Sequence, residues 1–126
     1  MDWVKDVIRS FGKHIGVEGL GFNNRGVCVL REEGDITIAI EDRDEVLLVY
    51  VSCPCPFISE ETMENALRST HYRATRAIPV GVCLTKNGYL TFFSHINRSS
   101  VTLPRLNETI QILYRLMNSL VGKERR

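Results

Sequence analysis

The stretch VLLVYV at residues 46–51 is apolar at every position, and this run constrains the fold more than any other feature of the sequence. Successive side chains of a β-strand point to opposite faces, so a strand without a polar face belongs in the middle of a sheet. The segment ITIAIE at 36–41 alternates isoleucine with smaller residues, which predicts a half-buried strand beside it. Polar turns at 31–35 and 42–45 separate these strands from each other and from a strand that starts at 27–30. We therefore predict a three-stranded antiparallel meander.

The rest of the chain predicts three helices and two further strands. Gly16 and Gly122 are placed to end helices, and Ser59 is placed to cap one. Asn87 and Gly88 together form a strong hairpin signal. The predicted elements are, in order, helix 2–15, strands 27–30, 36–41 and 46–51, helix 60–71, strands 77–85 and 89–96, and a helix from about 102 to 122.

This order, α-β-β-β-α-β-β-α, predicts an α+β fold in which helices pack on a twisted antiparallel sheet. The length suits a single domain over residues 1–126, with a loose tail from about 122 to 126. The last helix carries an apolar stripe whose burial contributes on the order of 10 kcal/mol as an upper bound. Its members are Leu103, Leu106, Ile110, Leu113, Met117 and Leu120. This helix is therefore expected to lie in the core.

Composition excludes several classes of partner. Sixteen basic and fifteen acidic residues give a net charge of +1, which does not favour nucleic acid or an anionic membrane. No apolar run approaches the length of a membrane span, and the first residues lack the pattern of a secretory signal. We expect a cytoplasmic protein whose four cysteines are reduced.

The stretch SCPCPF at 52–57 is the first candidate for chemistry. Zinc sites usually combine C-x2-C pairs with matching downstream ligands, whereas Cys53 and Cys55 form a C-x-C pair with single, scattered candidates elsewhere. The spacing also lacks the strand-then-helix context of a redox pair. We interpret Pro54 and Pro56 as residues that stop the strand and force an extended exit. Cys28 and Cys83 are expected to be small apolar residues within strands.

The other candidates for chemistry are weak as well. The glycines of GVEGLG have the wrong order for dinucleotide binding, and no phosphate-binding loop is present. His95 has no nucleophile motif to serve, and no G-x-S-x-G occurs. The cluster of Arg68, Tyr72, Arg73 and Arg76 is better explained as a solvated or interface rim than as an RNA site. The sequence thus predicts a binding protein that has no enzymatic activity, no cofactor and no metal.

The pattern VIRSFGKHIGVEGLGFNNRGVCVLREEGDITIAIE resembles the N-terminal half of class I type III secretion chaperones, the CesT/SycE-like family. The shared features are a first helix ending in F-G-x-x-(I/L)-G, a Gly/Phe loop, a strand, an acidic turn and a second strand. The stretches MDWVKDVIRSFGKHIGV and SSVTLPRLNETIQILYRLMNSLV are similar to the SycN subfamily. Its members act on the gatekeeper, a YopN-like protein that plugs the secretion apparatus, typically by pairing with a second small chaperone of the YscB type.

The resemblance implies an ATP-independent chaperone that binds the non-globular N-terminal segment of a secreted protein. It implies apolar client-binding grooves near the first helix and the sheet, with a client strand added to an exposed sheet edge. The implied client-binding residues are Phe11, Ile15, Leu20, Phe22, Val27, Val29 and Ile38. By the same resemblance the dimer interface is assigned to the second helix and the fourth strand, with Met63, Leu67, Tyr72, Val80, Val82 and Leu84.

Alternatives remain open at this point. The partner chain is either a different small chaperone or an identical copy. A homodimeric effector chaperone and a generic dimeric α+β adaptor or regulator have the same predicted shape.

Overall fold

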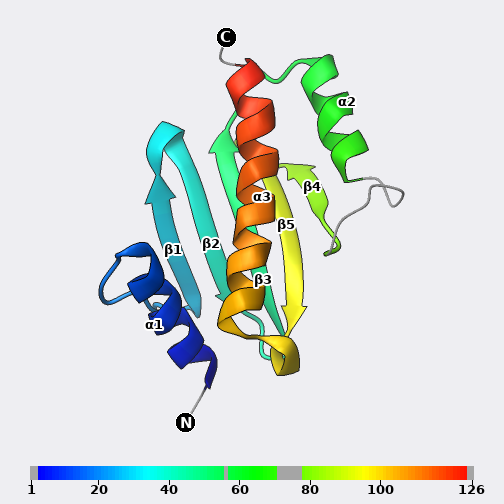
Figure 1. Ribbon diagram of the computed structural model, residues 1–126. Coiled ribbons are helices and arrows are strands. Elements are labelled where there is room, and N and C mark those ends of the chain that lie inside the picture. Colours follow the sequence, from blue (N-terminus) through cyan, green and yellow to red (C-terminus); the bar gives the residue numbers. More distant parts are fainter. Residues whose placement is uncertain (1–2, 56, 71–77, 125–126) are drawn as a thin grey trace.

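The computed structural model describes residues 3–55, 57–70 and 78–124 (Figure 1). Its helices and strands follow the predicted order α-β-β-β-α-β-β-α, so the expected α+β class is confirmed. The elements are α1 (Trp3–Ile15), β1 (Val27–Glu32), β2 (Ile36–Asp42), β3 (Val46–Pro54), α2 (Glu60–Ser69), β4 (Gly81–Leu84), β5 (Tyr89–Asn97) and α3 (Leu103–Glu124), with short 3₁₀ turns η1 (Glu33–Asp35) and η2 (Arg98–Ser100).

The strands form one antiparallel sheet in the order β1-β2-β3-β5-β4. β3, which contains the apolar run 46–51, is the central strand as predicted. Its odd-numbered residues from Leu47 to Cys53 are buried, and they pair with β2 and β5 residues that face the same side. The even-numbered residues of β3 are only half-buried. The central strand is therefore covered fully on one face and partly on the other.

Helices α1 and α3 cover the buried face of the sheet. Figure 1 shows α3 lying along β3 and β5, and α1 packs against α3 near one end of β1. The apolar stripe of α3 enters the core, and Leu106, Leu113 and Met117 are fully buried. Helix α2 packs against α3 at one end of the sheet. Among the described residues, no helix lies on the opposite sheet face, which we call the open face.

Two glycines explain the F-G-x-x-I-G pattern at the end of α1. Gly16 has a φ of +80°, the left-handed conformation that ends a helix. The chain then folds back, and the N–H of Val17 donates to the carbonyl of Gly12 at 2.7 Å. A Cβ on residue 12 would lie 2.8 Å from the Cβ of Leu20, so only glycine lets the returning loop pack this closely. The pattern is thus a helix end plus a loop contact.

The prolines of SCPCPF do not stop β3 where we predicted. The strand continues through Cys53 and Pro54, and Pro54 pairs with Tyr89 of β5. The N–H of Asp42 donates to the carbonyl of Gly26, just before β1, so the even-numbered residues of β2 direct their backbone groups toward β1 and the odd-numbered ones toward β3. The odd-numbered residues of β2 pair with even-numbered residues of β3, so the backbone of residue 54 is directed toward β2. The β2 pairing has already ended at Ser52, so the N–H that proline lacks is not needed there. Pro56 lies outside the described residues.

Other boundaries differ from the sequence-based ones in smaller ways. Gly122 does not end α3, because it does not adopt the left-handed conformation and the helix continues through Glu124. The fourth strand begins at Gly81, later than predicted: residues 78–80 precede it, Pro79 among them has no N–H to donate, and residue 77 lies outside the described residues. Ser59 caps α2 as predicted, because its hydroxyl oxygen accepts from the N–H of Thr62 at 3.1 Å.

Arg98 joins three segments at the end of the sheet nearest the N-terminus. Its guanidinium donates to Asp42 Oδ1 at 2.6 Å and to the carbonyl of Asp44 at 3.2 Å. The same group lies over the ring of Trp3, 5.8 Å from its centroid. The hydrogen bond from Arg98 lowers the pKa of Asp42 below its usual value of 3.8, against an opposing effect of burial.

Replacing Asp42 by asparagine is expected to destabilise the fold by about 1 kcal/mol at neutral pH, because the charge-assisted bond to Arg98 is lost. A lowered carboxyl pKa adds stability above the unfolded-state pKa, and this stability is lost as pH falls through the folded-state pKa. The difference between wild type and variant should therefore be constant at neutral pH and shrink as the pH falls below about 4. Urea unfolding at several pH values measures it, and a difference independent of pH would contradict the role given to Asp42.

Candidate functional site

A groove of about 230 Å³ lies where α1 and α3 meet the β1–β2 edge of the sheet. Phe11 and Ile15 reach it from α1, Ile38 from β2, and Ile110 from α3. Ile15 is 38% exposed, whereas Phe11 and Ile38 are almost fully buried and form the base. The complete lining is Phe11, Ile15, Leu30, Glu32, Ile38, Ile110, Gln111 and Tyr114. The groove is apolar, with a polar rim supplied by Glu32 and Gln111.

The outer edge of β1 borders this groove and is short. Asn23 closes its start, because its side-chain oxygen accepts from the N–H of Val27 and its own N–H donates to the Val27 carbonyl at 2.8 Å. Backbone direction alternates along a strand, so Val29 and Arg31 also point outward while Leu30 bonds to β2. Within the described residues, nothing bonds to the outward backbone groups of Val29 and Arg31. After Glu32 the chain turns into η1.

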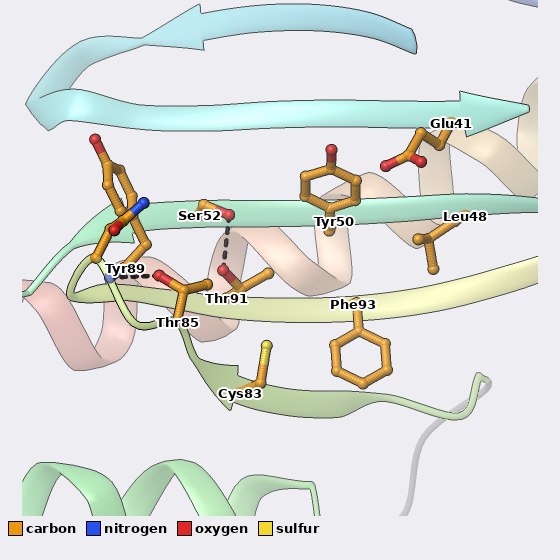
Figure 2. A pocket seen from close by; sticks show the side chains of 10 residues that line it. Glu41, Leu48, Tyr50, Ser52, Cys83, Thr85, Tyr89, Thr91 and Phe93 are labelled. Atoms are coloured by element: carbon orange, nitrogen blue, oxygen red, sulfur yellow. Dashed lines mark hydrogen bonds between the residues drawn. The ribbon is translucent and has the colours of Figure 1, made fainter. Parts of the chain in front are cut away.

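A second hollow, of about 550 Å³, lies on the open face over β3, β5 and β4. Figure 2 shows Tyr50 and Phe93 on neighbouring strands, with Leu48 and Cys83 nearby and Glu41 at one end. Next to them along the same two strands, Ser52 and Thr91 share a hydrogen bond of 2.8 Å between their hydroxyls (Figure 2). Burial raises the pKa of Tyr50, and the neighbouring Glu41 acts in the same direction. The phenol therefore stays neutral at physiological pH.

Phe93 shapes this hollow by lying over a glycine of the edge strand. Gly81 pairs directly with Phe93 across the β4–β5 ladder. A Cβ on residue 81 would lie 2.4 Å from the ring carbon Cζ, closer than any side chain tolerates. The absence of a Cβ at Gly81 thus allows the Phe93 ring to lie over the backbone of β4. Aromatic residues often cover glycines of a neighbouring edge strand in this way. No pattern of residue types predicts this contact, because it depends on strand register.

The implied client-binding residues fall into separate places. The groove brings together Phe11, Ile15 and Ile38, and it adds Leu30, Ile110 and Tyr114, which the sequence analysis had left out. Val27 and Val29 face the open side of β1, and Val29 is 46% exposed. Leu20 and Phe22 lie in the loop after α1, where they are half-buried against the core. Ile110 and Tyr114 could be found only once α3 was placed beside α1.

The described residues assigned to a dimer interface lie on one flank of the sheet, in α2, in β4 and just before β4 (Figure 1). Leu67 is 54% exposed and Leu84 is 42% exposed. Met63 is half-buried, while Val80 and Val82 pack partly against the core. Tyr72 lies outside the described residues, as do Arg73 and Arg76.

The cysteines are structural in three positions. Cys28, Cys53 and Cys55 are buried, and burial raises the pKa of Cys28 to about 11. A thiol with this pKa is protonated at neutral pH and is therefore a poor nucleophile. Cys83 is exposed, so the prediction of an apolar strand position was wrong for it: its strand is at the sheet edge and its side chain is on the open face.

No group of three potential ligands that could hold a metal ion occurs among the residues that the structure describes. The described helices include none that is long and apolar enough to cross a membrane.

The model of one family matches the chain over residues 3–121, that of the type III secretory system chaperone SycN. No curated protein sequence matches the chain. Among solved structures, the Yersinia pestis chaperone SycH in complex with a fragment of YscM2 is similar, with a TM-score of 0.70 and 13% identity over 94% of this chain and 98% of that one. The ExsC–ExsE complex gives a TM-score of 0.74 and 16% identity, covering 91% of this chain and 90% of that one.

A third similar structure is the ExoU–SpcU complex of Pseudomonas aeruginosa, with a TM-score of 0.70 and 17% identity over 91% of this chain and 95% of that one. At these identities the structural likeness establishes the fold, and the family model establishes the family. The expected resemblance to class I secretion chaperones is thereby confirmed. The chain belongs to the SycN family of type III secretion chaperones, and it is not an enzyme.

Proposed function

We propose that this chaperone binds the N-terminal non-globular segment of the secreted gatekeeper protein and keeps it competent for secretion in the bacterial cytoplasm, without using ATP. The groove of α1 and α3 takes apolar side chains of the segment, and the β1 edge takes its backbone. The SycN family supports the gatekeeper as client. Similar chaperones have been solved in complexes, SycH with a fragment of YscM2 and SchA with HopA1.

The observation that carries this proposal is the continuity of the groove with the β1 edge. Leu30 lines the groove, and its neighbours Val29 and Arg31 direct their backbone groups outward. A strand added at this edge would alternate its side chains, so every second one would enter the groove beside Leu30. Backbone hydrogen bonds would then supply affinity, and the groove would supply specificity.

A second chain completes the proposal. Leu67 and Leu84 leave apolar surface on the flank of α2 and β4, next to the open face with Tyr50 and Phe93. We propose that a second small chaperone, of the YscB type, covers this flank. An identical copy is the alternative, and it would make the chain a homodimeric effector chaperone. Native mass spectrometry of the complex purified from its host distinguishes the two by the mass of the second chain.

Replacing Val29 by proline tests the strand addition. Proline removes the outward N–H of residue 29 and places its ring where the client carbonyl would bind, while an edge strand of the free protein tolerates it. We expect about a tenfold loss of affinity for the gatekeeper segment, the equivalent of about 1.4 kcal/mol. Isothermal titration with that segment measures the loss.

The matched control is Val29→Ala, which keeps the N–H and removes the side chain. It should bind the segment nearly as well as the wild type, since Val29 points to the open face and away from the groove. Equal binding by the proline and alanine variants would exclude strand addition at β1. Failure of the wild type to bind any gatekeeper segment would overturn the proposed function as a whole.

A further inference from the structure

A third hollow, of about 460 Å³, lies between α1 and the loop that returns from its end. It is lined by Arg9, Lys13, Val17, Glu18, Gly19 and Leu20. The close packing of the loop on Gly12 places Leu20 beside the helix, and Val17 remains 36% exposed. Two cationic side chains, one carboxylate and two aliphatic side chains therefore share one hollow.

The cations belong to a row along the helix. Lys5, Arg9 and Lys13 are spaced by four residues, so they lie on one face of α1, and all three are exposed. Asp6 reaches Arg9 at 3.7 Å in an exposed pair. Lys13 makes no salt bridge with any described residue, although Glu18 lines the same hollow. We call Lys5, Arg9 and Lys13 the basic ridge.

The hollow and the groove use the same stretch of α1. Arg9 precedes the groove residue Phe11 by two positions, and Lys13 precedes the groove residue Ile15 by two positions. Two residues correspond to about 200° around a helix, so the hollow and the groove lie on opposite sides of α1. A chain that leaves the groove at Ile15 can cross the last turn of the helix and enter the hollow beside Lys13.

We propose that the hollow beside the basic ridge binds an acidic stretch of the secreted segment, in which a carboxylate lies next to an aliphatic residue. This inference rests on the proposed function, since it extends the path of the same segment. Arg9 and Lys13 would hold the carboxylate, and Val17 and Leu20 would contact the aliphatic side chain. The guanidinium of Arg9 can hold a carboxylate with two parallel hydrogen bonds.

Charge complementarity favours this occupant over others. The whole chain has a net charge of only +1, so the ridge is a local feature and does not reflect a general affinity for anions. The aliphatic pair Val17 and Leu20 beside the cations suits a peptide, which can present a carboxylate and an apolar side chain together. A nucleic acid or an anionic membrane would use the cations without the recess.

The test uses short fluorescent peptides in which leucine alternates with glutamate, glutamine or lysine. Fluorescence anisotropy with the full chain should show that the glutamate peptide binds about tenfold more tightly than the glutamine peptide, and that added salt removes the difference. In the variant Arg9→Glu/Lys13→Glu the preference should reverse, so that the lysine peptide binds best. Equal binding of the glutamate and glutamine peptides by the wild type would overturn the proposal.

Lys86→Glu/Arg115→Glu is the matched control, because it makes the same change in charge at two exposed residues that line none of the three hollows described above. It should keep the preference for the glutamate peptide. Loss of that preference in the control would show that the net charge of the protein, and not the hollow, determines which peptide binds best. Binding of phosphatidylserine vesicles or duplex DNA that is lost in Arg9→Glu/Lys13→Glu would also overturn the peptide assignment. If Arg9→Glu/Lys13→Glu still captures the gatekeeper segment at wild-type affinity, the inference of an acidic stretch fails while the proposed function stands.

Discussion

Replacing Ile15 by aspartate is expected to reduce affinity for the secreted segment by about a hundredfold, since a carboxylate buried among apolar side chains costs several kcal/mol. Ile15 is 38% exposed in the free protein and lines the groove with Phe11 and Ile38. Its side chain is therefore hydrated before binding and becomes buried when the segment enters. Isothermal titration with the gatekeeper segment measures the loss.

The adjacent residue provides the control. His14 is exposed in the same turn of α1, about 100° away around the helix, and it does not line the groove. His14→Asp introduces the same carboxylate and should bind the segment as the wild type does. Both variants should keep the thermal unfolding transition of the wild type within a few degrees, because neither residue is in the core. Wild-type affinity of a folded Ile15→Asp variant, or equally weak binding by both variants, would contradict the assignment of the groove as the binding site.

Replacing Gly81 by alanine is expected to destabilise the fold by about 1–3 kcal/mol, as overpacking generally does. The direction is informative, because alanine in place of glycine within a strand normally stabilises by about 0.5–1 kcal/mol. Here the new Cβ would lie 2.4 Å from the ring of Phe93, so the ring has to move into the hollow on the open face. Urea denaturation measures the change in the free energy of unfolding.

A second substitution tests the cause. In a Phe93→Leu background the ring is absent, and Gly81→Ala should become neutral or stabilising. The coupling free energy from the four proteins of the double-mutant cycle should therefore be large and of the sign expected for a relieved clash. An equal loss of stability in both backgrounds would show that Gly81 is required for its backbone and not for the contact with Phe93.

The sequence was sufficient for the fold because its strongest signals are local and periodic. The apolar run at 46–51 predicted the central strand, and the stripe of α3 predicted a buried helix. Boundaries failed where tertiary context decides. Pro54 can remain within β3 because the pairing with β2 has already ended at Ser52. Gly122 lies within α3, which continues through Glu124. Neither fact is visible in the residue types alone.

The site was less predictable than the fold. Family resemblance pointed to α1 and the sheet, and Phe11, Ile15 and Ile38 do meet in one groove. Tyr114 and Ile110 come from a helix about a hundred residues further along the chain, so no local pattern links them to Ile15. Both faces of β3 are apolar in the sequence, yet the residue types do not tell which face α3 covers and which it leaves open.

The shortness of the β1 edge has a consequence for solubility. An exposed strand edge can recruit copies of the same chain and grow into aggregates. Here the side chain of Asn23 already binds the backbone of Val27, and the strand ends where η1 begins after Glu32. The charged residue Arg31 lies on the edge between these two points. Two outward residues are too few to hold another edge without further contacts. Under the proposed function, a client strand that also fills the groove would gain those further contacts, whereas a second copy offering its edge alone would not.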